Sequence, residues 1–232
     1  GKNTLSSSDY KAGDRIPTKN GKYYMVIFGM SMDRAPSVIT KATKFDKVYC
    51  VGDSRTADTK MALGVAVPSN VEFIAKWGEG LYWFKSTGYR QLLSSVSKQP
   101  KNSKKAVIIN LGVNDLNNGR AYVTYMKKVA ANLKKYNCKM YYLSVNPVNS
   151  AMIKSVGGKA RSEAQIASFN RTIYKNLCSG KNKSFTYINS CTNLQMKGWI
   201  SNRHDMGIYD GLHYSNATYL RIFDYCMRYL NR

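Results

Sequence analysis

Three short segments of this 232-residue chain carry side chains that could together perform nucleophilic chemistry at a carbonyl group. They are residues 52–54 (Gly-Asp-Ser), 112–115 (Gly-Val-Asn-Asp) and 210–213 (Asp-Gly-Leu-His). A serine nucleophile needs a base to remove its proton, the base needs an orienting carboxylate, and the developing oxyanion needs hydrogen-bond donors. Each segment alone is weak evidence, because such short peptides recur by chance. Together they offer one candidate for every role.

The serine and histidine of these segments are the predicted nucleophile and base. Ser54 stands between an expected strand and an expected helix, although a serine there is by itself an ordinary helix cap. Of the two histidines, His213 is favoured because Asp210 precedes it by three residues and the glycine between them permits a tight loop. The other histidine, His204, lies beside Asp205, and that pairing would be strained because adjacent side chains diverge.

Donors for the oxyanion are predicted from a backbone amide, an asparagine and a glycine. The Asn114 side chain can donate without adding charge, and the amide of Ser54 lies at a helix start. Gly80, which follows the second expected strand, could offer a further N–H, with Gly78 as the less favoured choice. The simpler interpretation of either glycine is a turn.

Apolar runs of strand length alternate with amphipathic segments of helix length from residue 47 onward. This alternation predicts a parallel sheet covered by helices on both faces, with the ligand site beyond the carboxyl ends of the strands. The first two segments directly follow the first and third strands, and the third segment precedes the last helix, so all three can meet at that edge. The expected strands are 47–51, 71–77, 106–111, 139–145 and 185–188, and the expected helices are 54–63, 89–96, 121–136, 163–177 and 217–230.

Taken in this order, the three motifs resemble the conserved blocks of the SGNH (GDSL-type) hydrolases, which include bacterial carbohydrate and cell-wall O-acetylesterases. The resemblance runs from about residue 47 to the C-terminus, and Arg55 stands where the family name has leucine. It implies an α/β fold: a flavodoxin-like three-layer α/β/α sandwich with a five-stranded parallel sheet and neither metal nor other cofactor. It implies catalytic Ser54, Asp210 and His213, and an oxyanion hole of Ser54, Gly80 and Asn114, with Gly80 the loosest match.

Residues 1–45 fit this pattern less well. Residues 23–28 could form an extra strand, and residues 6–8 (Ser-Ser-Ser) are typical of a linker. We therefore expect an N-terminal extension over 1–45 and a catalytic domain over 46–232. No apolar run approaches the roughly 20 residues that a membrane-spanning helix needs.

Basic residues dominate the charge: 36 Lys and Arg stand against 13 Asp and Glu, a formal net charge of +23. Such an excess attracts polyanions, among them nucleic acid, a membrane surface and an acidic polysaccharide. The basic residues are scattered along the sequence without a known nucleic-acid motif, which argues against a specific nucleic-acid partner. We expect a generally cationic monomer, extracellular or associated with a bacterial cell surface, with an anionic cell-wall polymer as candidate partner.

The five cysteines include no Cys-x-x-Cys pair, so a zinc or redox site is not expected. Cys178 and Cys191 flank a connection between a helix and a strand and could form a disulfide, although the sequence does not fix their distance.

Aromatic and amide side chains near the expected site favour a sugar as the group that carries the ester. Arg55, Trp83 and Asn146 are the predicted substrate contacts, with core packing an equal alternative for Trp83 and the favoured one for Tyr82. The sequence thus predicts hydrolysis of small acyl esters, acetyl foremost, on a carbohydrate or cell-wall polymer. Two alternatives stay open: an O-acetyltransferase with the same residues, and a non-catalytic cationic polyanion-binding protein.

Overall fold

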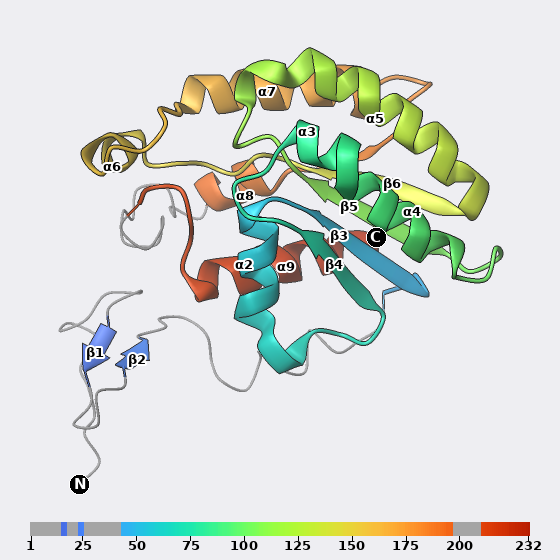
Figure 1. Ribbon diagram of the computed structural model, residues 1–232, viewed down its shortest axis with the longest axis horizontal. Helices are drawn as coiled ribbons and strands as arrows, with labels where there is room; N and C mark the ends of the chain where they lie inside the picture. The colour runs from blue at the N-terminus through green and yellow to red at the C-terminus, as the bar shows by residue number, and fades with distance from the viewer. Residues whose placement is uncertain (1–14, 18–22, 26–42, 197–209) are drawn as a thin grey trace, which may run out of the picture.

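The structure is a computed structural model that describes residues 15–17, 23–25, 43–196 and 210–232. Its centre is a five-stranded parallel sheet in the order β4-β3-β5-β6-β7 (Figure 1). Counted along the chain this is the order 2-1-3-4-5 of flavodoxin-like sheets, which confirms the predicted fold class. The strands are β3 (Lys47–Gly52), β4 (Val71–Ala75), β5 (Lys105–Asn110), β6 (Cys138–Leu143) and β7 (Thr186–Ile188).

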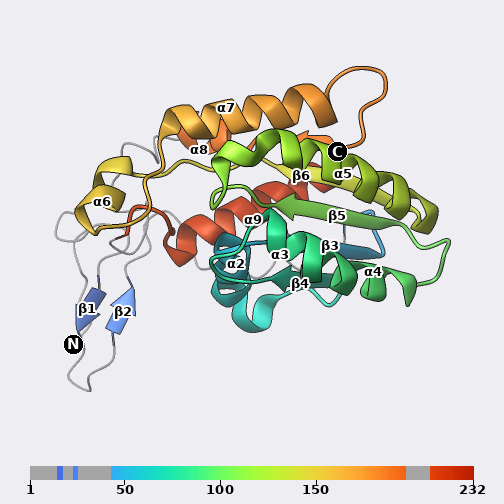
Figure 2. The ribbon, with the colours of Figure 1, turned by 45° about the horizontal axis from the view of Figure 1, so that its top comes forward.

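Helices cover both faces of this sheet, as Figures 1 and 2 show from two angles. Along β3, Tyr49 and Val51 pack into the core of one face, while Val48 and Cys50 pack into the core of the other. Such alternation is the period of a strand that is buried on both sides. The first face carries α3 (Leu81–Trp83), α4 (Tyr89–Ser97), α5 (Gly119–Leu133) and α7 (Glu163–Ile173), and the second carries α2 (Ser54–Leu63), α8 (Ser190–Met196) and α9 (Asn216–Leu230).

Local capping signals explain where the long helices begin. The hydroxyl of Ser215 accepts from the backbone N–H of Thr218 at the start of α9. Ser162 and Gln165 form a reciprocal capping box at the start of α7. At α2 the cap is Asp53, whose carboxylate accepts from the N–H of Arg55, and this leaves Ser54 as the first helical residue.

Several boundaries differ from the predicted ones. Strand β4 ends at Ala75, two residues early, because Trp77 and Gly78 form a turn in which Gly78 has a φ of +74°. Helices α5 and α7 give way to a 3-10 turn (Lys134–Tyr136) and a π-helical turn (Tyr174–Cys178) before their predicted ends. Short helices lacked a clear periodic signal and were missed: α3 with the π-helical turn Phe84–Gly88, α6 (Ser150–Ser155) and α8.

Near the N-terminus, β1 (Arg15–Pro17) pairs antiparallel with β2 (Tyr23–Met25). Strand β2 spans the first half of the strand predicted over residues 23–28, and residues 26–28 lie outside the described part. The division at residue 45 stays a prediction. None of the helices that the structure describes is long and apolar enough to cross a membrane.

All five cysteines, which lie in the described part of the chain, are free thiols, so Cys178 and Cys191 do not form the disulfide that the sequence allowed. Burial raises the pKa of both thiols, to about 12 for Cys178 and about 11 for Cys191. Thiols held in this protonated form are poor nucleophiles.

A fully buried lysine fastens the loops at the amino-terminal end of the sheet. Lys105, the first residue of β5, is 0% exposed. Its ammonium group donates to the carbonyl oxygens of Pro100, Ser103 and Tyr136 at 2.8, 2.9 and 3.0 Å. One charged side chain thus joins the loop before β5 to the end of the helical segment before β6.

We predict that Lys105→Met lowers the free energy of unfolding by about 3 kcal/mol, because the hydrogen bonds from one ammonium group to three part-buried carbonyl oxygens are lost. Urea denaturation of both proteins measures the difference. The matched control is Lys104→Met, at an exposed neighbouring position, where a change within about 0.5 kcal/mol is expected. Equal denaturation midpoints for Lys105→Met and the unmodified protein would contradict the prediction.

Candidate active site

A line of hydrogen bonds joins Ser54, His213 and Asp210. The Nε2 atom of His213 lies 2.8 Å from the Oγ atom of Ser54, and its Nδ1 atom lies 2.5 Å from Oδ2 of Asp210. Burial favours a raised pKa for Asp210, but hydrogen bonds from the His213 ring and from two backbone amides outweigh it and lower the pKa to about 2. The ionised carboxylate therefore accepts from Nδ1, which leaves Nε2 free to accept the proton of the serine.

Two glycines allow the backbone segments next to Ser54 and His213 to pack closely against neighbouring groups. A Cβ atom at Gly52, the last residue of β3, would collide with the Thr56 side chain and the carbonyl oxygen of Asn110. Gly211, between the aspartate and the histidine, has a φ of +71°, and a Cβ there would press on the carbonyl oxygen of Asn149. That backbone contact includes a hydrogen bond, since the N–H of Asn149 donates to the Gly211 carbonyl at 2.8 Å.

Arg55 was predicted to contact the substrate, but the structure places it inside the protein. Its side chain is buried, and its guanidinium donates to the carbonyl oxygens of Asn146, Pro147 and Leu212 at 2.8–3.1 Å. It also lies over the ring of Tyr214, 4.9 Å from the centroid. The arginine therefore fastens α2 to the loop that carries His213, and its donors are used inside the protein.

The other two predicted substrate contacts are also buried. Trp83 is 5% exposed and packs in the core, where its ring fills the space that a side chain at residue 88 would need. Asn146 is 3% exposed, and its side-chain oxygen accepts from the hydroxyl of Ser190 at 2.5 Å. Both predictions are corrected: the Trp83 side chain belongs to the hydrophobic core, the Asn146 side chain is held by Ser190, and neither has the exposed surface that a substrate contact needs.

The segment 112–115 holds the segment around Gly80. The side-chain N–H of Asn114 donates to the carbonyl oxygen of Glu79 at 2.8 Å. The Asp115 carboxylate accepts from the N–H of Leu81 at 2.9 Å and from the hydroxyl of Tyr122 at 2.6 Å. A Cβ atom at Gly80 would collide with that carboxylate. Asp115 was not among the predicted site residues, although its position inside the 112–115 motif was a signal.

Arg161 is a second site residue that no sequence motif indicated. It lies between α6 and α7 and is half-buried, and its guanidinium donates to the Val113 carbonyl at 2.7 Å and to Oδ1 of Asn114 at 2.8 Å. Because the amide oxygen of Asn114 is held by this cation, the amide nitrogen must face the opposite way. Lys159 adds a bond from its ammonium group to the carbonyl oxygen of Asn114 at 3.3 Å.

Two aromatic residues close in sequence to Gly80 have exposed side chains. Trp77 is 58% exposed, and its indole N–H donates to Asp58 at 2.8 Å. Tyr82, two residues beyond Gly80, is 84% exposed, although core packing was its favoured interpretation. The alternative base His204 and its neighbour Asp205 lie outside the described residues.

Comparison with known protein families gives one match over most of the chain: the sequence model of the GDSL-like Lipase/Acylhydrolase family matches residues 48–226. This range includes all three motifs. The comparison with curated protein sequences returned no match.

Solved structures with the same fold include an acetyl xylan esterase, with 17% sequence identity and a TM-score of 0.57 over 79% of this chain and 98% of that one. A GDSL-like lipase from Bacteroides thetaiotaomicron has 17% identity and a TM-score of 0.56, over 79% of this chain and 86% of that one. At these identities the likeness establishes the shared fold.

Asp53, which directly precedes Ser54, has a buried carboxyl group whose pKa is raised, whereas the pKa of Asp210 is lowered. It is 1% exposed, and burial raises its pKa to about 6, although the Arg55 charge and backbone amide oppose the shift. Its ordinary value is 3.8. Between these values the folded protein holds a proton that the unfolded chain releases, so this group makes folding less favourable as the pH rises.

We predict that Asp53→Asn, which keeps a helix-capping side chain, removes this dependence. The stability of the variant relative to the unmodified protein should increase by about 3 kcal/mol from about pH 4 to pH 6 and then level off. Urea denaturation at several pH values measures it. Asp210→Asn is the control. The ionised Asp210 stabilises the folded state above pH 3.8 and loses this contribution toward pH 2, so the stability of Asp210→Asn relative to the unmodified protein should fall as the pH rises through this range. A stability difference between Asp53→Asn and the unmodified protein that does not change with pH would contradict the prediction.

Proposed function

The chain belongs to the family of GDSL-like lipases and acylhydrolases, and we propose that it is a serine esterase that removes small acyl groups, acetyl foremost, from a carbohydrate. The observation that carries this proposal is the continuous hydrogen-bonded line from Ser54 through His213 to Asp210. Such a line activates a hydroxyl group for attack on an ester without a metal ion or other cofactor.

In the proposed reaction, Ser54 Oγ attacks the ester carbonyl carbon while Nε2 of His213 takes the hydroxyl proton. The ionised Asp210 stabilises the resulting imidazolium. His213 then donates the proton to the departing alkoxide, which leaves an acyl group on the serine. Water attacks this acyl-serine with His213 again as base, and the carboxylic acid departs from the restored hydroxyl.

The oxyanion formed in each step needs donors that are already in place. We assign them to the N–H of Ser54 at the start of α2, the N–H of Gly80 and the second amide hydrogen of Asn114. The first amide hydrogen of Asn114 is engaged by Glu79, which fixes the direction of the second. Donors that are fixed before the reaction need no reorganisation when negative charge develops on the carbonyl oxygen.

A carbohydrate substrate is favoured by the side chains exposed around these segments. The faces of Trp77 and Tyr82 are available to solvent, and flat aromatic faces pack well against the apolar faces of sugar rings. The acetyl xylan esterase of the same fold is by its name an enzyme for acetyl groups on a polysaccharide. The net charge of +23 adds a preference for an anionic polymer, and we propose a monomer at the bacterial cell surface or outside the cell.

Acyl transfer is the second candidate reaction, because a sugar hydroxyl can replace water in the attack on the acyl-serine. The same residues would serve both outcomes. The third candidate, a non-catalytic polyanion-binding protein, has against it a hydrogen-bonded serine, histidine and aspartate that binding alone would not require.

Hydrolysis of p-nitrophenyl acetate, compared with longer-chain esters, tests the proposal. We expect acetate to be preferred, and Ser54→Ala and His213→Ala to lower kcat by at least about 10³-fold. Ser94→Ala, at an exposed position on α4, is the matched serine control and should keep full activity. Adding an oligosaccharide acceptor separates transfer from hydrolysis. Activity that survives in Ser54→Ala would contradict the assigned nucleophile.

A second prediction concerns Arg161, which acts through Asn114 and is therefore a positioning residue. Arg161→Met frees the amide of Asn114 to rotate, so we expect kcat to fall roughly 10- to 100-fold with little change in KM. Because both substitutions disable the same donor, adding Arg161→Met to Asn114→Ala should cost little more activity. Lys159→Met is the matched control and should be nearly silent. Losses that multiply in the double variant would contradict this role.

A further inference from the structure

A groove of about 680 Å³ lies at the end of the sheet opposite to Ser54. Its walls come from the starts of β6 and β7, the loops before β3 and β5, and the C-terminal half of α5. Ser54 follows the carboxyl end of β3, and the strands are parallel, so the groove and the nucleophile occupy opposite edges. The groove is lined by Phe45, Lys104, Lys127, Ala130, Ala131, Lys134, Asn137, Cys138, Lys139, Met140, Lys183, Ser184, Phe185 and Thr186.

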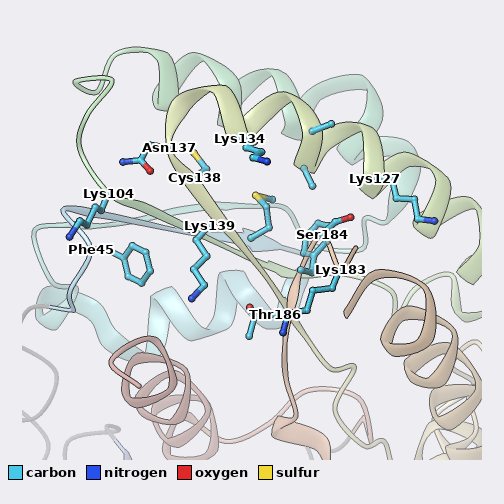
Figure 3. A pocket seen from close by; sticks show the side chains of 14 residues that line it. Phe45, Lys104, Lys127, Lys134, Asn137, Cys138, Lys139, Lys183, Ser184 and Thr186 are labelled. Carbon is cyan, nitrogen blue, oxygen red and sulfur yellow. The ribbon is translucent and has the colours of Figure 1, made fainter. Parts of the chain in front are cut away.

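Five of these lining residues are lysines, and all five are exposed. Figure 3 shows them around the groove, with Lys104 on one side and Lys127 on the other. Neither Asp nor Glu is among the lining residues that the structure describes, and none of the five ammonium groups forms an ion pair within that part of the chain. The nearby carboxylate of Asp46 is engaged by the backbone N–H of Lys104 at 2.7 Å.

Concentrated positive charge of this kind raises the local concentration of anions and repels itself until an anion binds. The five lysines come from four separate parts of the chain, which explains why the sequence showed scattered charge. The fold gathers them because strands of a parallel sheet all begin at one edge. Five of the basic residues that are scattered in the sequence therefore lie around one groove in space.

We propose that this groove binds an acidic polysaccharide, separately from the ester-cleaving site. Lysine offers a point charge on a flexible stem, which suits single carboxylates spaced along a polymer better than bidentate recognition of one compact anion. Between the lysines, Ser184 and Thr186 bring hydroxyl groups that can bond to sugar hydroxyls, and Asn137, whose amide nitrogen donates to the carbonyl oxygens of Asn102 and Ser103, brings its amide oxygen. The choice of a polysaccharide among polyanions rests also on the proposed function.

Single-stranded nucleic acid fits the groove less well. Such strands are bound by exposed aromatic rings on which bases stack, as well as by positive charge. The two aromatic side chains in the lining, Phe45 and Phe185, are 7% and 2% exposed and belong to the core. The groove therefore offers charge and hydrogen-bonding groups without a stacking surface.

Distance allows the two sites to be occupied together. A six-residue strand such as β5 spans roughly 20 Å, so a polymer segment in the groove leaves Ser54 uncovered. A long acidic chain held in the groove would keep the protein near the polymer, while other segments or neighbouring chains present their esters to the nucleophile.

Binding of a fluorescently labelled oligogalacturonate to the 232-residue protein tests the proposal. The measurement uses Ser54→Ala as the background, so that catalysis plays no part. The groove variant adds Lys127→Gln, Lys134→Gln and Lys183→Gln. The matched control adds Lys60→Gln, Lys85→Gln and Arg90→Gln, which removes the same charge from exposed positions on α2, the π-helical turn and α4, outside the groove.

We expect the groove variant to bind at least about 10-fold more weakly, with a salt dependence shallower by roughly two released ions, and the control to lose under about 3-fold. Equal losses of affinity in both variants would contradict a specific site and indicate general electrostatic attraction to the cationic surface. Tighter binding of oligothymidylate than of oligogalacturonate would contradict an acidic polysaccharide as the ligand of the groove.

The proposed function is tested apart from this binding. With Ser54 intact, the groove and control substitutions should both leave hydrolysis of p-nitrophenyl acetate unchanged, because neither set contacts the catalytic residues. Loss of hydrolysis in the groove variant would overturn the claim that the two sites are separate.

Discussion

The buried guanidinium of Arg55 makes the hydrogen bonds on which the geometry of the proposed catalytic site depends. Ser54 begins a helix, whereas His213 sits 159 residues later in a loop without strand neighbours. Arg55 bridges the two, since it follows Ser54 in α2 and donates twice to the carbonyl oxygen of Leu212, next to His213. A buried cation is tolerated here because carbonyl groups and the Tyr214 ring replace its water. Removal of the guanidinium would take its hydrogen bonds from the carbonyl oxygens of Asn146 and Leu212, whereas that of Pro147 would keep the Tyr214 hydroxyl, so the arginine helps to hold the loop in place.

Two carboxyl groups near His213 show how environment separates their roles. Asp210 receives the histidine ring and two backbone amides, which holds its pKa at about 2 and keeps it ionised. Asp53 is more deeply buried and receives one backbone amide at the start of α2, so its pKa rises to about 6. In the proposed mechanism the first supplies the charge that an imidazolium needs, and the second caps the helix that begins at Ser54. Divergent environments of this kind are how a site assigns different tasks to the same functional group.

The sequence predicted the sheet and the three motifs because these depend on short-range patterns. Apolar runs such as Val48–Val51 and a cap directly before α2 are visible without knowledge of the fold. The contacts of Arg55, Trp83 and Asn146 could not be predicted in this way, since the direction of a side chain near a sheet edge depends on distant loops. Arg161 was missed for the same reason: its partners Val113 and Asn114 lie about 47 residues away and belong to another connection.

One topological rule organises both ends of the molecule. Because the five central strands are parallel, residues that follow strands gather at one edge and residues that begin strands gather at the other. Ser54 and Asn114 lie at the first edge, where Asn114 contacts the segment around Gly80 and short connections hold the proposed donors and the proposed nucleophile. At the second edge, Lys105 turns inward to fasten the loops, while Lys104, Lys139 and their neighbours turn outward. Spacing along the sequence therefore conceals clusters that the sheet makes compact, and charge scattered in sequence can still form a site.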